Sequence, residues 1–311
     1  MTHRCTSQHR DSQTLTELTR KCDLRQLGLD PHNITQVDHI HEKHGGRVYR
    51  ISCGNTSFVL KCFPDPAQAD EVRCYALLQH HGVPTLPVHG QADNAILLED
   101  LAVSPTWRPA AEPDVESPKV GRALAQWYRT LHAAGREILA APDGPPPFLG
   151  REIDALDPAV VLDIGQKLGL AANPVWRLAA DSVGRLVHAM RSLPETLNYN
   201  DFHWTNLALS RHRTQPLRAI VYDYHLLGIG VPYSDWRNVI GSLGKRAKAA
   251  FIEAYGPVDE REALLDAPLS ILFGLAVAVQ RPHLPEWAKD LLPAVQSGRL
   301  EADFRRALDT L

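Results

Sequence analysis

Hydrophobic and polar residues alternate along residues 37–62 of this chain. Glycine-containing turns interrupt the alternation at residues 44–46 and 54–56. Alternation turns every second side chain of a strand toward one face, and glycine permits the tight reversals that connect neighbouring strands. The pattern therefore predicts a three-stranded antiparallel meander.

The next segments combine helical spacing with one further apolar run. Residues 69–82 carry apolar side chains three and four positions apart and end in a glycine, which predicts a helix. The run AILLEDL at residues 95–101 indicates a buried strand, which follows a turn region at residues 90–94. Together these elements predict a small α+β lobe over residues 31–100.

Helices dominate the rest of the chain. A proline-rich connection at residues 104–118 precedes one amphipathic helix. A second helix is expected to begin after Asn173 and to bury apolar residues as far as Met190. Two short β-like runs, NLAL and RAIVYD, interrupt the helices, which resume at Ser234. We expect a larger, mainly helical lobe over residues 101–311 and a partly helical leader over residues 1–30. The predicted fold class is α+β with two lobes.

Composition narrows the classes of partner. The chain has 311 residues, of which 44% are hydrophobic and 22% charged, and its net charge is −3. No basic stripe suits a nucleic-acid backbone, and the longest uncharged apolar run, residues 267–280, is too short to span a bilayer. The polar N-terminus lacks a signal-peptide core, so we expect a cytoplasmic protein. Five cysteines at irregular spacing are expected to be free thiols.

Three polar residues in the C-terminal half carry the strongest chemical signal. Asp201 and Asn206 in YNDFHWTN have the spacing of a phosphoryl-transfer loop, and Asp223 ends the next strand-like run. Magnesium prefers oxygen ligands, which Asn206 and Asp223 can supply to hold it against nucleotide phosphates. Asp201 would then face the acceptor hydroxyl and orient it.

A lysine in the third predicted strand completes this set. Alternation places Lys61 on the same strand face as Val59, and a lysine among apolar residues needs a partner. Glu71, near the start of the following helix, can supply it, with Asp70 as the alternative. Such a pair would hold Lys61 toward the α- and β-phosphates of a nucleotide.

Two further segments are candidates for nucleotide contact. Gly45 and Gly46 allow a tight turn whose backbone N–H groups can approach phosphate closely, although any hairpin can use two glycines. The backbone of Glu99, Asp100 and Leu101 would read the edge of the nucleotide base.

The ordered set resembles the aminoglycoside phosphotransferase and choline kinase superfamily over about residues 35–260. The resemblance rests on YNDFHWTN and VYDYHLLGIGVPYSD, and it implies the bilobal protein-kinase-like fold. It also implies a nucleotide-dependent kinase with Asp201 as catalytic base and Mg²⁺ and ATP (or GTP) as cofactors. His203 and Asp235 match positions expected to brace the catalytic loop. Trp204 could contact the substrate, or it could pack beneath the loop.

One departure from the family concerns the residues just before the catalytic aspartate. The family usually has His-Gly there, whereas this chain has Tyr199-Asn200. The change puts the substrate and the loop geometry in doubt, and it keeps open a catalytically impaired nucleotide-binding or scaffold protein. A protein kinase is disfavoured, because no long activation segment separates Asp223 from Asp235.

The substrate class follows only loosely from charge. From residue 101 onward the sequence has 24 Asp plus Glu and 23 Lys plus Arg, which is a near balance. A pocket for a polycationic aminoglycoside should concentrate negative charge, so a neutral or singly charged small molecule fits better. An aminoglycoside kinase remains an alternative, and the sequence does not indicate the oligomeric state.

Overall fold

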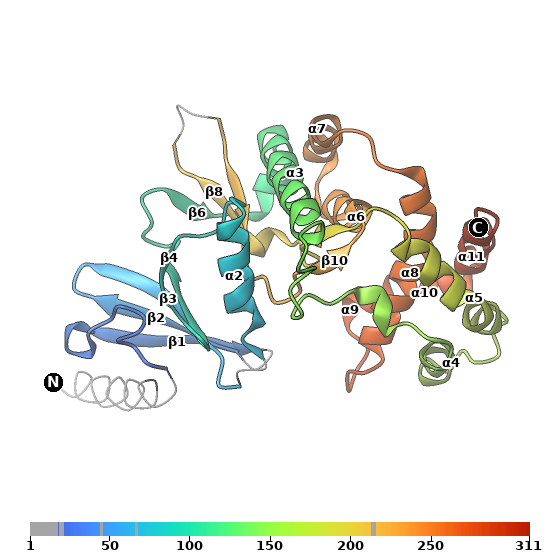
Figure 1. Cartoon of the computed structure of the whole chain (residues 1–311), viewed down its shortest axis with the longest axis horizontal. Coiled ribbons are helices and arrows are strands. Elements are labelled where there is room, and N and C mark those ends of the chain that lie inside the picture. The colour runs from blue at the N-terminus through green and yellow to red at the C-terminus, as the bar shows by residue number, and fades with distance from the viewer. Residues whose placement is uncertain (1–17, 19–21, 44–45, 66–67, 213–215) are drawn as a thin grey trace. The chain divides into compact units, whose positions relative to one another are not determined.

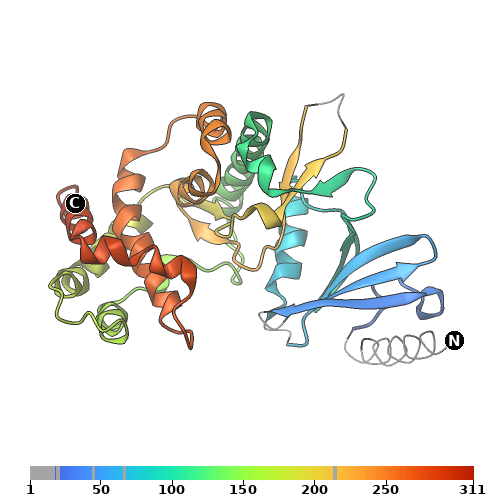
Figure 2. The same cartoon turned by 180° about the vertical axis from the view of Figure 1, so that it is seen from behind.

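The computed structural model describes residues 18, 22–43, 46–65, 68–212 and 216–311 (Figures 1 and 2). The chain divides into two compact units, which are described one at a time. The first unit contains the residues up to 127 together with 201–226 and 242–254, and the second contains 128–200, 227–241 and 255–311. The domain boundaries expected near residues 30 and 100 stay predictions.

A five-stranded antiparallel sheet forms the N-terminal part of the first unit. Its strand order is β1-β2-β3-β5-β4. The alternating residues 37–62 form its first three strands, so the predicted meander is confirmed. The strands are β1 (Gln36–Lys43), β2 (Gly46–Cys53), β3 (Thr56–Cys62), β4 (Val88–Ala92) and β5 (Ala95–Glu99).

Strand β4 is an element that the sequence analysis missed. The predicted turn region at residues 90–94 is partly strand, because β4 pairs antiparallel with β5 and the reversal itself is only two residues long. Gly90 allows a close approach that no other residue would, since a Cβ atom there would lie 2.2 Å from the carbonyl oxygen of Leu27. The glycine that suggested a turn therefore serves strand packing.

The two faces of β3 have different environments, as its alternation predicts. Leu60 and Cys62 join a buried apolar cluster with Leu24 and Leu27 from the segment before β1. Lys61 projects from the opposite face. The leader predicted over residues 1–30 lies mostly outside the described residues, and its described residues 24–28 form turns.

The expectation of free thiols is wrong for two cysteines. Cys22 and Cys62 form a disulfide that links the segment before β1 to the end of β3. The two residues are 40 positions apart in the sequence, and only the packing of that segment on the sheet brings them together. Cys53 and Cys74 are free, whereas Cys5 lies outside the described residues.

The remainder of the first unit positions the polar residues of interest. The helix predicted at residues 69–82 is present as α2, and the β-like runs NLAL and RAIVYD form β8 and β9 of a three-stranded sheet, with β6 from the proline-rich connection. The bounds are α2 (Asp70–His80), β6 (Trp107–Pro109), β8 (Leu207–Ser210), β9 (Ala219–Val221), α3 (Pro118–Leu139) and α7 (Lys245–Tyr255), with the last two helices extending into the second unit.

Helices packed around one apolar core form most of the second unit. Trp176 lies fully buried against Gly165, where a Cβ atom would come within 2.8 Å of the indole ring. A two-stranded sheet of β7 and β10 was not expected from the sequence. The elements are α4 (Pro158–Lys167), α5 (Val175–Arg191), β7 (Thr196–Asn198), β10 (Gly228–Gly230), α6 (Pro232–Ser242), α8 (Glu260–Ala278), α9 (Glu286–Lys289), α10 (Leu292–Gln296) and α11 (Arg299–Leu308).

Four short 3-10 helices complete the described elements, namely η1 (Pro31–Asn33), η3 (Glu112–Glu116), η4 (Glu152–Ala155) and η5 (Trp204–Asn206). Within the described ranges, no helix is both long enough and apolar enough to cross a membrane.

Candidate active site

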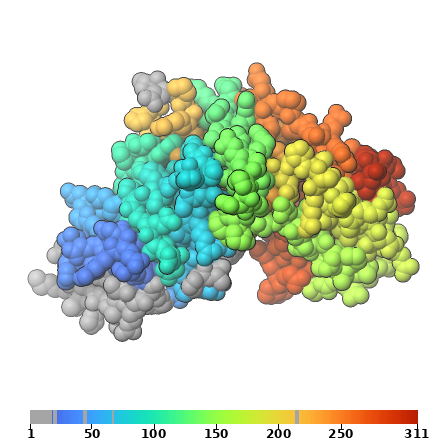
Figure 3. Space-filling model, in the orientation of Figure 1, coloured from blue at the N-terminus to red at the C-terminus, as the bar shows by residue number. Residues whose placement is uncertain are grey.

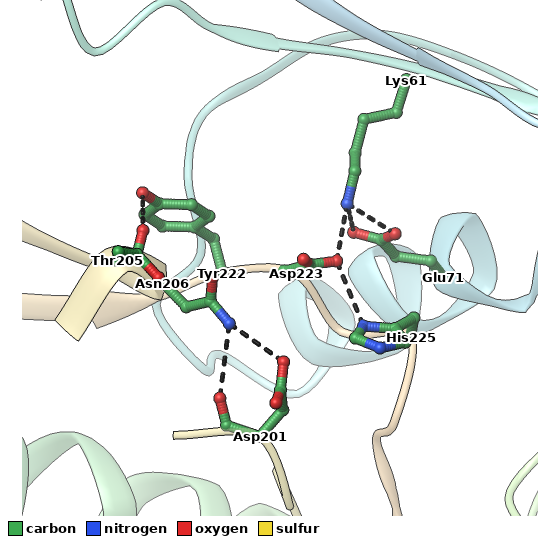
Figure 4. Close-up of polar contacts among 8 residues, drawn as sticks. All are labelled: Lys61, Glu71, Asp201, Thr205, Asn206, Tyr222, Asp223 and His225. Atoms are coloured by element: carbon green, nitrogen blue, oxygen red, sulfur yellow. Dashed lines mark hydrogen bonds and ion pairs between the residues drawn. The ribbon is translucent and has the colours of Figure 1, made fainter. Parts of the chain in front are cut away.

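The first unit brings Lys61 between two carboxylates (Figure 4). Strand β3 directs the Lys61 ammonium toward α2, where Nζ lies 2.6 and 2.7 Å from the carboxylate oxygens of Glu71. The same Nζ lies 2.8 Å from Oδ1 of Asp223, which follows β9. The structure thus contains the ion pair of Lys61 with Glu71 that the sequence predicted. Asp70, the alternative partner, contacts Arg73 on the surface.

Charged neighbours determine the ionisation of Lys61 and Asp223, whereas burial prevails at Glu71 and raises the pKa of its carboxyl. Burial works against the charged form of Lys61, but the carboxylates of Glu71 and Asp223 outweigh it and raise the pKa of the ammonium. Burial likewise opposes ionisation of Asp223. Hydrogen bonding to His225 and the charge of Lys61 prevail, so the pKa of the Asp223 carboxyl is well below its ordinary value. Asp223 is therefore an anion in the folded protein across the physiological pH range.

Asp201 and Asn206 contact one another directly, which the sequence analysis did not predict. Asn206 donates from Nδ2 to Oδ2 of Asp201 at 3.0 Å and to its backbone oxygen at 3.3 Å. The 3-10 turn η5 brings the two residues together, and the backbone oxygen of Asn206 accepts the amide of Tyr222 at 2.9 Å. This last bond ties the turn to the strand that leads into Asp223.

His225 is a member of the cluster that the sequence analysis missed. Its Nδ1 lies 3.2 Å from Oδ1 of Asp223. One carboxylate oxygen each from Asp201 and Asp223 and one ring nitrogen of His225 lie within 4.8 Å of one another. The place of His225 two positions after Asp223, the metal-ligand candidate, was the available signal in the sequence.

In each unit a backbone position is left-handed although it is not a glycine. Asp223 has φ +73° and Asn200 has φ +65°. Among residues with a side chain, Asn and Asp tolerate this region best, and such conformations concentrate at functional sites. Asn200 thereby adopts a conformation that glycine adopts freely, so the Asn in place of the family's Gly is compatible with this turn.

A cavity of about 500 Å³ opens beside the cluster within the first unit. Its volume lies in the usual range for small-molecule sites. Its lining includes the predicted nucleotide-binding residues Val59, Lys61, Glu99, Asp100 and Leu101 and the predicted metal ligands Asn206 and Asp223. The carboxylate of Asp100 is already engaged by Arg50 at 2.7 Å and Ser57 at 2.6 Å, which leaves the backbone of this segment as its contribution.

The glycine turn lies at the edge of the described residues. Gly46 begins β2 and lines a smaller cavity of about 60 Å³ together with Lys61, Glu71 and Asp223. Gly45 lies outside the described residues. The structure thus brings one of the two predicted glycines next to the lysine cluster.

His203 and Trp204 lie near the surface of the loop. His203 is exposed, and its Nδ1 lies 2.8 Å from Oγ1 of Thr205 and accepts the Thr205 amide at 3.3 Å. These bonds cap η5. Trp204 is half-buried, and its ring is tilted against that of His203 at 5.5 Å between centroids. These contacts do not distinguish between the two roles expected for Trp204, substrate contact and packing beneath the loop.

In the second unit, Asp235 is fully buried near the start of α6. Its carboxylate accepts the amide of Tyr199 at 2.8 and 3.1 Å and the amide of Asn200 at 3.0 Å. His132 contacts Asp235 through Nε2 at 3.2 Å and the Tyr255 hydroxyl through Nδ1 at 2.8 Å. This anchored segment ends immediately before Asp201 in the sequence, an arrangement that favours the bracing role expected for Asp235.

Comparison with known proteins agrees with this geometry. Residues 39–265 match a family described as the phosphotransferase enzyme family, and this chain belongs to that family. No curated protein sequence matches the chain. The expectation of a small-molecule phosphotransferase is confirmed at the level of the family.

Solved structures show the same fold at low sequence identity. The chain resembles a Plasmodium vivax ethanolamine kinase with a TM-score of 0.58 and 13% identity, over 88% of this chain and 85% of that one. It resembles APH(2″)-IIa, in a ternary complex with streptomycin and ATP, with a TM-score of 0.56, 12% identity and coverage of 96% and 98%. It also resembles a GDP complex of aminoglycoside 2′-phosphotransferase-IIIa, with a TM-score of 0.56 and 15% identity, over 93% of this chain and 98% of that one. The protein-kinase-like fold class is confirmed.

Proposed function

We propose that this protein transfers the γ-phosphoryl group of ATP or GTP, in the presence of Mg²⁺, to a hydroxyl group of a small molecule. The observation that carries the proposal is the Lys61 ammonium held between Glu71 and Asp223. Phosphoryl transfer depends on positioned positive charge beside the nucleotide phosphates, and this lysine, held by two ion pairs, lines the cavity that could receive them.

The donor set of the cluster fits Mg²⁺. Asp223 supplies an ionised carboxylate, and Asn206 uses Nδ2 to bind Asp201, which leaves its Oδ1 as a second oxygen ligand. Mg²⁺ is a hard cation that prefers such oxygens, and when bound it neutralises charge on the β- and γ-phosphates. Asp223 and Asn206 are the residues that would hold it.

Asp201 has the properties of a residue that positions the acceptor. The hydrogen bond from Asn206 fixes one carboxylate oxygen, Oδ2. The carboxylate can then orient the acceptor hydroxyl and take its proton as the bond to phosphorus forms. In a loose transition state this proton moves late, so placement matters more than basicity.

The choice between ATP and GTP stays open. The proposed nucleotide cavity contains the backbone of Glu99, Asp100 and Leu101, which suits contact with the edge of a purine base. Solved structures of the same fold include complexes with ATP and with GDP. A direct competition between the two nucleotides for the purified protein decides the preference.

The proposal is tested with nucleotide binding followed by turnover. Purified protein is heated with ATP or GTP, with Mg²⁺ or with EDTA, and the midpoint of unfolding is recorded. A panel of hydroxyl compounds that includes ethanolamine and streptomycin is then screened by ³¹P NMR for a new phosphate ester. We expect a metal-dependent rise in the midpoint and transfer to at least one acceptor. Binding without transfer to any acceptor would support the catalytically impaired alternative.

The same panel tests the charge of the acceptor. From residue 101 onward, acidic and basic residues are nearly balanced, 24 against 23. We predict that kanamycin-like polycations are poor substrates compared with neutral or singly charged compounds, as measured by kcat/KM. Efficient phosphorylation of kanamycin would show that local carboxylates, and not the overall balance, select the substrate.

A further inference from the structure

A second cavity in the first unit is distinct from the proposed nucleotide site. It has a volume of about 920 Å³ and shares no lining residue with the nucleotide cavity. The start of α3 forms one side of the cavity. The end of β8 and the residues just before β9 form the other side, and both sides reach the surface shown in Figure 3. We call it the basic groove, because its lining includes the basic residues Arg108, Lys119, Arg122, Arg211, His212 and Arg218.

Two arginines of the basic groove are fixed in place by uncharged partners. Arg211 donates from Nε to the backbone oxygens of Ser104 and Trp107, both at 2.8 Å. The guanidinium of Arg218 lies 5.0 Å from the ring centroid of Trp107. Neither a carbonyl nor an indole ring removes a full positive charge. The fold therefore orders two guanidinium groups and leaves their charge uncompensated.

The helical side of the groove adds two more positive charges. Lys119 and Arg122 are exposed and lie three positions apart on α3, where like charges repel one another. Among the described residues, no carboxylate forms an ion pair with Lys119, Arg122, Arg211 or Arg218. Arg108 differs, because Asp114 accepts from its guanidinium at 2.6 and 2.8 Å.

None of the described residues that line the groove is acidic. Four unmatched cations around one cavity create a local positive potential that attracts an anion. Arginine forks match phosphate oxygens in pairs, and lysine supplies a point charge to the same group. We propose that the basic groove binds a small polyanion that carries at least two phosphate groups.

The extent of the groove argues for a small ligand. Its volume corresponds to a site for a metabolite, and its charges are confined to one cavity, whereas a nucleic-acid backbone needs a basic stripe along a surface. The net charge of the chain, −3, also disfavours a long polyanion. A compact, multiply charged molecule is the ligand that this arrangement suits.

Inorganic tripolyphosphate is the probe for this site. Its binding to the wild-type protein is measured by isothermal titration calorimetry in EDTA at low salt, so that no metal links it to Asp223. We expect one equivalent to bind with an affinity that falls as salt rises. Lys119→Ala/Arg122→Ala removes two charges at exposed helix positions and should weaken binding by about tenfold or more. Arg218→Gln should weaken it in the same direction.

Two controls make the result specific. Arg177→Ala/Arg185→Ala removes the same charge from exposed positions of α5 and should leave the affinity within about twofold, as should Lys61→Ala in the nucleotide cavity. Equal weakening by the α5 variant, or loss only in Lys61→Ala, would overturn the proposal, as would absence of binding. Tighter binding of a single-stranded oligonucleotide than of tripolyphosphate would overturn it too.

Discussion

The two units of this protein each hold an acidic side chain that is shielded from solvent, partly at Asp223 and almost fully at Glu262, yet the ionisation of the two side chains differs. Asp223 in the first unit contacts Lys61 and His225, and its carboxyl pKa is lowered. Glu262 in the second unit accepts only a backbone amide, that of Tyr233 at 2.9 Å, among its described contacts. Burial raises the pKa of Glu262 to about 7, and the nearby charges of other carboxylates add to the effect.

The contrast shows that burial alone does not make a carboxylate into a metal ligand. Burial disfavours the charged form in both units. At Asp223 the hydrogen bond with His225 and the charge of Lys61 reverse the outcome, whereas the same lysine does not reverse it at Glu71. In the first unit, Lys61 keeps Asp223 ionised while Glu71 keeps Lys61 in place. The cluster therefore combines an ionised carboxylate with a cation, which suits the phosphates and the metal ion of the proposed function, whereas Glu262 has no cation among its described contacts.

Removal of the ionised carboxylate should have the largest effect on nucleotide binding. Asp223→Ala takes away a charged oxygen ligand, so we expect the Mg²⁺-dependent gain in ATP affinity to be lost and turnover to fall by about 10²-fold or more. Calorimetric titration of ATP with Mg²⁺ and with EDTA measures the gain. Glu262→Gln is the matched control and should retain it. An unchanged affinity in Mg²⁺ would mean that Asp223 is not a metal ligand.

Replacement of Lys61, the cation that Glu262 lacks, should have the next largest effect on catalysis. Lys61→Ala should lower kcat/KM by about 10²-fold because the α- and β-phosphates lose their positive partner. Glu71→Gln should cause a milder loss of the same kind. In a double-mutant cycle the two losses should be non-additive by about 0.5–3 kcal/mol. Additive losses would show that Glu71 does not act through Lys61.

The titration of Glu262 should affect the stability of the folded protein and not its activity. Its folded-state pKa is raised, so the folded protein holds a proton that the unfolded chain releases once the pH exceeds the ordinary value for glutamate. The contribution of Glu262 therefore becomes unfavourable as the pH rises from about 4.5 to 7.

Glu262→Gln keeps the acceptor for the Tyr233 amide and removes the titration. Relative to wild type, we expect it to be more stable by about 1–3 kcal/mol at pH 8 and by much less at pH 5. Urea unfolding at the two pH values measures the difference. An equal difference at both would show that Glu262 titrates normally in the folded protein.

Local pattern predicted the parts of the fold that local forces determine. The alternation in β3 placed Lys61 opposite the apolar cluster, and the helical spacing that followed placed Glu71 within its reach. Strand β4 was missed because it is short and contains a glycine, which resembles a turn in the sequence. Short strands of this kind are defined by their pairing partner more than by their own residues.

Contacts between distant segments could not be predicted from the sequence. The Cys22–Cys62 disulfide depends on how the residues before β1 cover the sheet. The contact of His132 with Asp235 joins residues 103 positions apart, and no periodic pattern signals it. His225 was closer to discovery, since it stands two residues after Asp223, but no sequence pattern signals the left-handed backbone of Asp223.

The most direct test of the account separates chemistry from nucleotide binding at Asp201. Asp201→Asn keeps the size of the side chain and removes the carboxylate that would receive the acceptor proton. With the best acceptor from the hydroxyl panel, kcat and the affinity for ATP in Mg²⁺ are measured for wild type and variant. We predict that kcat falls by about 10³-fold or more while the affinity stays within about threefold. Full turnover in Asp201→Asn would contradict the assignment of this site as the centre of phosphoryl transfer.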